Sequence, residues 1–287
     1  MILRAFGTLT LSVGSVMWLN GQVVEAYGDA LRHPRAQITP KSYMASPNSR
    51  YEVAGSTSTY SVNYAFKGLK TASMKWSWSH SKAQVDGLVS SYGIPKSMLN
   101  PYSPTPDVVA DRQKQLLAGC FRQDGAHLRP NYRELIRTSR PVVETVAQLF
   151  DKQQPDANLT DRVNFVLNFC QDLPYGIPPS EIDGKLNGGL LPPAGVLSQG
   201  WGDCDSKATL FGTLMSFYPN AKMVMVAVPG HQLVGIRAQA VSGQDSIQFE
   251  GEEYVLCEPV GLARLPMGKK SKLVTTIEWT RRVLPYE

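Results

Sequence analysis

The chain has 287 residues, of which 43% are hydrophobic and 18% are charged, an ordinary globular mixture that excludes wholesale disorder and is long enough for about two domains. Its 29 Lys and Arg residues outnumber its 24 Asp and Glu residues only slightly and are spread along the chain, which argues against nucleic acid as a partner. The four cysteines form no C-x-x-C pair, so the usual zinc-finger and thioredoxin-like motifs are excluded.

The first 26 residues have the character of a targeting segment. Arg4 precedes an apolar run at residues 5–19, which is short for a membrane-spanning helix of about 20 residues but fits the apolar region of a signal peptide. We therefore expect residues 1–26 to be a signal peptide or membrane anchor, which implies a periplasmic or secreted protein and N-terminal membrane association. The alternative is a buried strand or helix of a cytoplasmic protein, because Val24 stands where a cleavage site prefers a small residue.

Residues 27–58 are rich in Pro, Ser, Arg and Gly and lack periodicity, which predicts a linker. Residues 59–130 form the next expected unit, an N-terminal β-hairpin and helical region. Apolar and polar residues alternate over 60–67 and again over 73–80, with Gly68 between the two runs, which predicts the hairpin. Helical spacing and stop signals then predict helices over residues 85–92 and 107–120.

The remaining residues, 131–287, are expected to form a second domain. A Gly- and Pro-rich stretch at 175–202 has no periodicity, and a long irregular segment of this kind is typically functional or mobile, so we interpret it as a substrate-gating loop. The patterns around it predict helices over 132–150 (interrupted near Pro141), 161–172 and 203–218, and strands over 223–228, 232–238, 247–249 and 254–257.

Cys204 is the cysteine with a physical argument for reactivity. It follows Gly202 and Asp203 at the first turn of a predicted helix, where unpaired backbone N–H groups and the helix dipole favour a thiolate and can stabilise an oxyanion. The neighbouring Asp203 and Asp205 oppose the thiolate, so a positive partner is required. The alternative is a helix-capping region with an incidental thiol.

His231 and Glu258 are the candidate partners of this thiol. His231 follows a Pro-Gly turn and opens a predicted strand, so its imidazole can face a site rather than the core. Glu258 ends another predicted strand, and antiparallel pairing of the two strands would place it beside His231. A carboxylate in that position holds the imidazole in one tautomer and stabilises its protonated form. Asp245, in a polar turn, is the alternative carboxylate.

The three candidates lie in the segments GWGDCDSKATLFGTLM, VMVAVPGHQLVGI and YVLCEPVG, which together resemble the transglutaminase-like cysteine peptidases of the papain-like superfamily, bacterial type. The helical segments NYRELIRTSRPVVETVAQLF and DRVNFVLNFCQDLPYG extend this resemblance to about residues 131–261. The resemblance implies an α+β fold with a papain-like or transglutaminase-like core. In that core the nucleophile helix packs on an antiparallel β-sheet, and the smaller N-terminal β-hairpin and helix region precedes it.

The resemblance also implies roles for individual residues. Cys204 would be the nucleophile, His231 the general base and acid, and Glu258 the orienting carboxylate, although many family members have Asp at that position. Gln171 resembles a position that assists the oxyanion in related enzymes, and a surface glutamine at a helix end is the alternative. Trp201 and Asp203 flank the nucleophile and are expected to shape the substrate cleft.

The reaction implied by the resemblance is acyl transfer at a carboxamide of a peptide or protein substrate through a thioester, without a cofactor or metal. We prefer peptidase or amidase hydrolysis, and protein transglutamination and a non-catalytic binding or scaffolding module are the alternatives. Cys170 and Cys257 are predicted to pack in the core. A disulfide between Cys120 and Cys170, and the oligomeric state, stay open.

Overall fold

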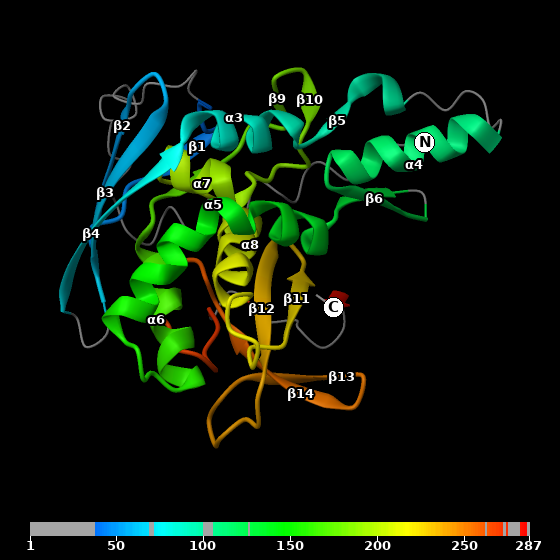
Figure 1. Cartoon of the computed structure of the whole chain (residues 1–287). Coiled ribbons are helices and arrows are strands. Elements are labelled where there is room, and N and C mark those ends of the chain that lie inside the picture. The colour runs from blue at the N-terminus through cyan, green and yellow to red at the C-terminus, as the bar shows by residue number, and fades with distance from the viewer. Residues whose placement is uncertain are drawn as a thin grey trace.

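The structure is a computed structural model that describes residues 38–68, 72–99, 106–125, 127–261, 263–271, 274 and 282–285. The fold is α+β, as predicted: the described residues form six α-helices and several antiparallel sheets (Figure 1). The expected signal peptide or anchor at residues 1–26 lies outside the described residues. Within the described part of the chain, none of the helices has the length and apolar character needed to span a membrane.

The predicted hairpin is confirmed and belongs to a three-stranded sheet. Strands β3 (Thr59–Lys67) and β4 (Ser73–Ser81) pair with Tyr64 opposite Trp76, and β2 (Arg50–Gly55) pairs with the other edge of β3. Residues 27–58 therefore differ from the expected linker, because their described part contains β2 and also β1 (Ser42–Met44). Strand β1 pairs with β8 (Tyr175–Ile177), a partner so remote in sequence that no local pattern could reveal it.

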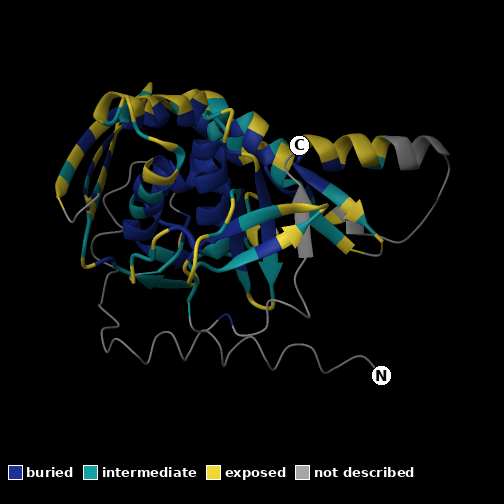
Figure 2. Ribbon diagram, turned by 90° about the horizontal axis from the view of Figure 1, so that it is seen from below, coloured by how far each residue is buried: buried dark blue, intermediate teal, exposed yellow. Residues whose placement is uncertain are grey.

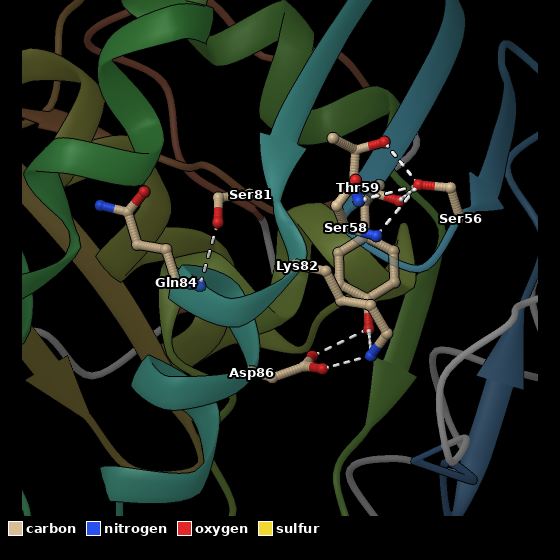
Figure 3. A network of polar contacts seen from close by, with 8 residues as sticks. Ser56, Ser58, Thr59, Ser81, Lys82, Gln84 and Asp86 are labelled. Atoms are coloured by element: carbon tan, nitrogen blue, oxygen red, sulfur yellow. Dashed lines mark hydrogen bonds and ion pairs between the residues drawn. The ribbon is translucent and has the colours of Figure 1, made fainter.

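A polar network fixes the start of α3 (Lys82–Ser91) against this sheet (Figure 3). Ser81 caps the helix by accepting the Gln84 N–H. The Tyr60 hydroxyl of β3 donates to Asp86 at 2.8 Å, and the Lys82 ammonium donates to both Tyr60 and Asp86. The network joins β3 to α3, which are separated along the chain by β4. It therefore holds the hairpin and α3 together as one unit.

The aromatic face of the hairpin packs on helices α5 (Tyr132–Gln153) and α6 (Leu159–Asp172). The predicted interruption near Pro141 is wrong, because α5 is continuous. Proline removes one backbone donor from the helix, but Val142, Val143 and Val146 of the same helix are buried in the core. Their burial stabilises the helical conformation that the local proline rule disfavours.

A five-stranded antiparallel sheet lies on the other side of the core. Its strands are in the order β13 (Ser246–Phe249), β14 (Glu252–Cys257), β12 (His231–Arg237), β11 (Met223–Val228) and β15 (Arg282–Pro285). Helix α8 (Cys204–Met215) packs on this sheet, and its Leu210 and Phe211 share one hydrophobic cluster with Val234 of β12. Figure 2 shows that the buried residues gather in this central region, whereas exposed residues follow the outer helices.

The remaining short elements lie at the end of the molecule that carries α4 (Figure 1). A second hydrophobic cluster holds this end together, with Tyr92 stacked on Phe121 at a centroid distance of 5.4 Å. The elements are β5 (Ile94–Pro95), the 3-10 helix η2 (Lys96–Leu99), α4 (Pro106–Ala118), β6 (Phe121–Asp124), β7 (His127–Pro130), β9 (Glu181–Ile182) and β10 (Lys185–Leu186).

The Gly- and Pro-rich stretch at 175–202 differs from the expected irregular loop. It contains β8, β9, β10 and the helix α7 (Pro193–Gln199), and every residue from 190 to 203 is buried. A helix that is buried on all sides carries no amphipathic pattern, which is why the sequence lacked periodicity here. Its burial makes this part of the stretch a packed segment beside α8, which opposes the expected gating role.

Candidate functional site

Cys204 occupies the first position of α8, and the sequence before it explains how the helix begins there. Asp203 is the N-cap: its carboxylate accepts the Ser206 backbone N–H at 3.1 Å and the Ser206 hydroxyl at 2.5 Å. Gly202 bridges to β8 through hydrogen bonds with Gly176 and Pro174, both at 3.3 Å. The helix start is therefore fixed by its cap and by the neighbouring strand, and Cys204 itself is partly exposed.

His231 and Glu258 form the hydrogen-bonded pair that strand order predicted. Strands β12 and β14 are antiparallel with Val234 opposite Cys257, so the register carried one step further sets Glu258 diagonally beside His231. The His231 Nε2 atom lies 2.7 Å and 2.9 Å from the two Glu258 carboxylate oxygens. The Glu258 residue is 1% exposed, whereas the His231 side chain is 21% exposed. Because Nε2 is engaged, Nδ1 is the ring nitrogen that Glu258 leaves free.

Asp205 connects the thiol to this pair. The Cys204 Sγ donates to the Asp205 carboxylate at 3.7 Å, and the negative charge of Asp205 also acts on His231. Burial by itself would lower the pKa of His231, but the hydrogen bond and charge of Glu258, together with Asp205 and Asp203, raise the pKa above its ordinary value. The alternative carboxylate, Asp245, instead forms an ion pair with Lys270.

The surroundings of Cys204 oppose the thiolate, as the two neighbouring aspartates led us to expect. Burial raises the pKa of Cys204 well above its ordinary value, and the charges of Asp205 and Asp203 raise it further, whereas the Asp205 backbone N–H opposes this shift. The helix terminus is therefore outweighed by two adjacent carboxylates and by burial. Cys204 is a neutral thiol at neutral pH, and it needs a base to become a nucleophile.

We expect Asp203→Asn to increase the reactivity of this thiol. Asparagine caps helices about as well as aspartate, but it removes a buried negative charge beside the sulfur. The alkylation rate of Cys204 by iodoacetamide at pH 7.5 should rise roughly tenfold. The matched control is Asp156→Asn, which removes the same charge from an exposed loop and should leave the rate unchanged. An unchanged rate in the Asp203 variant would contradict the electrostatic account.

The same variant should change how stability depends on pH. Burial and the charge of Asp205 raise the pKa of Asp203 to about 7, above its ordinary value of 3.8. The folded state thus binds this proton more tightly than the unfolded chain, so the protein loses stability as pH rises from about 4 to about 7. The Asn variant should lack this loss, which urea unfolding at both pH values would measure.

Gln171 is buried rather than on the surface, and its contacts give it a positioning role. Its side-chain N–H groups donate to the backbone carbonyls of Glu258 at 2.7 Å and Leu265 at 2.8 Å. Both donors are therefore occupied, so the expected contact with an oxyanion is not available in this state. Gln171 instead fixes the chain at Glu258, the residue that holds His231.

Trp201 and Asp203 both lie beside Cys204, as their sequence positions require. Trp201 is 4% exposed and packs over Gly176, where an added Cβ would lie 2.5 Å from the indole ring. Glycine at 176 is therefore needed for this close approach. Asp203 acts as the cap and as a source of negative charge, so neither side chain forms an open cleft wall as expected.

Lys207 is a residue that the sequence reasoning missed. It lies one turn after Cys204 on α8, is 1% exposed, and its ammonium donates to the Leu173 carbonyl at the end of α6. Burial lowers the pKa of Lys207 to about 8, opposed by Cys170, Asp172, Asp203 and Glu258. The feature of the sequence that could have identified it is a lysine on the apolar side of a buried helix. Lys207 supplies positive charge to an acidic site.

The other three cysteines are buried and have free thiols. Cys170 and Cys257 are fully buried in the main core, which confirms their predicted packing role. Cys120 belongs to the second cluster, so no disulfide joins it to Cys170. Across the described ranges, no group of three or more His, Cys, Asp or Glu side chains is arranged to hold a metal ion.

Comparisons of the chain with protein-family models, with curated proteins and with solved structures find no match. The arguments about function therefore rest on the geometry of the site itself.

Proposed function

We propose that this protein catalyses cysteine-dependent acyl transfer at carboxamide bonds on a papain-like or transglutaminase-like core. Hydrolysis of a peptide or amide bond is the form of this reaction that we prefer. The observation that carries the proposal is the His231–Glu258 hydrogen bond, because it orients the imidazole and because the Glu258 charge also acts on the Cys204 thiol. Nucleophile, base and orienting carboxylate are the parts that covalent acyl transfer requires.

The proposed reaction begins with proton transfer from the Cys204 thiol to His231 Nδ1. The thiolate attacks the carbonyl carbon of the substrate, and N–H groups at the start of α8 stabilise the negative oxygen of the tetrahedral intermediate. His231 then donates its proton to the leaving amine as the C–N bond breaks, which leaves a thioester. Water attacks the thioester while His231 accepts its proton, and the acid and the free thiol are released.

Glu258 has a specific task in this sequence. Its carboxylate accepts the Nε2–H of neutral His231, which keeps the Nδ1 lone pair free for the thiol proton. The same carboxylate stabilises the imidazolium that forms after that proton transfer, in keeping with the raised pKa of His231. The imidazolium then offsets the charges of Asp203 and Asp205, which oppose the thiolate in the resting state.

Solvent exposure favours hydrolysis over transamidation. Cys204 is partly exposed, and the His231 side chain is 21% exposed, so water can reach a thioester formed there. In protein transglutamination, the first alternative, a substrate amine takes the place of water. Adding a primary amine during turnover and detecting the amide product would distinguish the two outcomes.

A thiol-directed probe tests the proposed catalytic role. The other cysteines are at most 5% exposed, so iodoacetamide should label Cys204 selectively, and Cys204→Ala should abolish labelling. We expect His231→Ala to slow labelling at pH 7 by about 10- to 100-fold, because the general base is lost. His127→Ala, on an exposed strand remote in sequence from the site, is the matched control.

Equal and slow labelling with and without His231 would remove the catalytic proposal. It would favour the second candidate, a non-catalytic binding module that retains the fold. The observation in favour of that candidate is the resting thiol, which donates to Asp205 and has a raised pKa.

A further inference from the structure

A cavity of about 390 Å³ lies at the α4 end of the molecule, in the size range of small-molecule sites. It is an open cavity whose lining comes from β5, α4, the β6–β7 hairpin and the segment around β10. These elements come from separate parts of the chain and lie at the same end of the molecule (Figure 1). The residues that line it are Ile94, Arg112, Phe121, His127, Leu128, Leu186 and Gly188.

The cavity combines apolar walls with positive charge. Phe121 and Ile94 belong to the buried cluster of this end, and Leu128 and Leu186 pack against that cluster, so the walls are fixed by the fold. Gly188 has φ +65°, a backbone conformation that favours glycine, and an added Cβ there would lie 3.4 Å from the Phe121 ring. None of the described residues that line the cavity is acidic.

Arg112 provides the observation that points to a ligand. Its Nε atom is buried and has no hydrogen-bond partner among the described residues. Because this Nε atom is closed to solvent, a ligand in the cavity would meet the terminal N–H groups of the guanidinium, and a carboxylate is the acceptor that their geometry fits best. His127, exposed at the cavity, offers a second polar contact.

We propose that this cavity is a binding site for a small carboxylate that carries an apolar or aromatic group. The carboxylate accepts hydrogen bonds from the Arg112 guanidinium, and the apolar group lies against Phe121, Leu128 and Leu186. Two sources have this chemistry: the C-terminal end of a peptide with an apolar last residue, and a free aryl or alkyl acid. The site contains neither Cys204 nor His231, so it does not depend on the proposed acyl transfer.

Calorimetric titration of the full chain with three probes tests the site. N-acetyl-phenylalanine represents a peptide end, 3-phenylpropionate represents a free acid, and N-acetyl-phenylalaninamide lacks the carboxylate. We expect at least one of the acids to bind saturably, and the amide to bind at least about tenfold more weakly. Tighter binding of the first acid identifies a peptide end, and tighter binding of the second identifies a free acid.

Variants of α4 distinguish a specific contact between the ligand and Arg112 from a general effect of positive charge. Arg112→Met should weaken binding of the acid by at least about tenfold, and Arg112→Lys should weaken it less. Lys114→Met removes the same charge from an exposed position on α4 and should bind as the unaltered protein does. Melting curves check that each variant is folded, and the comparison of acid with amide on the unaltered protein needs no variant. Equal binding of acid and amide, full binding by folded Arg112→Met, or no binding of either acid would overturn the proposal.

Discussion

Glu258→Gln is expected to slow acylation of Cys204 by about 10²- to 10⁴-fold while leaving the nucleophile in place, because the orienting charge behind the imidazole is lost. Glutamine can still hydrogen-bond to His231 Nε2, but it cannot stabilise the imidazolium electrostatically. The measurement is the burst of nitrophenolate released when p-nitrophenyl acetate acylates the thiol, together with the mass of the thioester. Glu252→Gln is the matched control, because that residue is exposed at the start of β14, the strand that Glu258 follows.

The pKa of His231 provides an independent readout of the same variant. In the unaltered protein burial lowers this pKa, but Glu258 and the nearby aspartates raise it overall. Without the Glu258 charge the pKa should fall, so the imidazolium should lose its proton at lower pH. An NMR titration of the His231 ring measures this shift directly. An unchanged titration together with an unchanged acylation rate would show that Glu258 does not orient the base.

Phe150→Ala is expected to lower the free energy of unfolding by about 3–5 kcal/mol, the typical cost of removing a large aromatic side chain from a packed core. Phe150 is fully buried on α5, and its ring lies 4.7 Å from that of Trp76 on β4 and 5.0 Å from that of Phe165 on α6. The side chain therefore joins the hairpin sheet to both helices. Urea unfolding followed by tryptophan fluorescence and by circular dichroism measures the change.

The number of unfolding transitions is a second readout of this variant, because one hydrophobic cluster runs from the hairpin through α5 and α6 to α8. We expect both signals to shift together in a single transition. The control is Leu117→Ala, which alters a leucine that is 51% exposed and should change stability by about 0.5 kcal/mol or less. Two separate transitions, with only one of them shifted, would instead show that the hairpin and the helices unfold independently.

The sequence predicted the elements whose patterns are local. Strand β11 has the predicted bounds, and the antiparallel pairing of β12 with β14, which was the condition for placing Glu258 beside His231, is present. This pairing brings Glu258 beside His231. In an antiparallel pair the end of one strand lies beside the start of the other, so this part of the site could be predicted from the sequence.

The remaining features depend on tertiary contacts that leave no local pattern. Strand β1 pairs with β8, more than a hundred residues away, and the buried α7 has no polar face to give it a period. For Gln171 the sequence left an oxyanion contact and a surface position open, because the two carbonyls that accept its hydrogen bonds come from distant segments. For Cys204 the two opposing carboxylates were visible in the sequence, but the burial that raises the pKa of the thiol further was not.

The neutral state of Cys204 has a consequence for resistance to oxidation. Hydrogen peroxide attacks thiolates, so a partly exposed cysteine that stays protonated converts slowly to sulfenic acid. Cys204 lies beside Asp203 and Asp205, whose negative charges also disfavour anionic oxidants near the sulfur. Under the proposed mechanism, the sulfur becomes reactive only when its proton passes to His231 during attack on a substrate. The acidic residues around the nucleophile would therefore protect it chemically between turnovers.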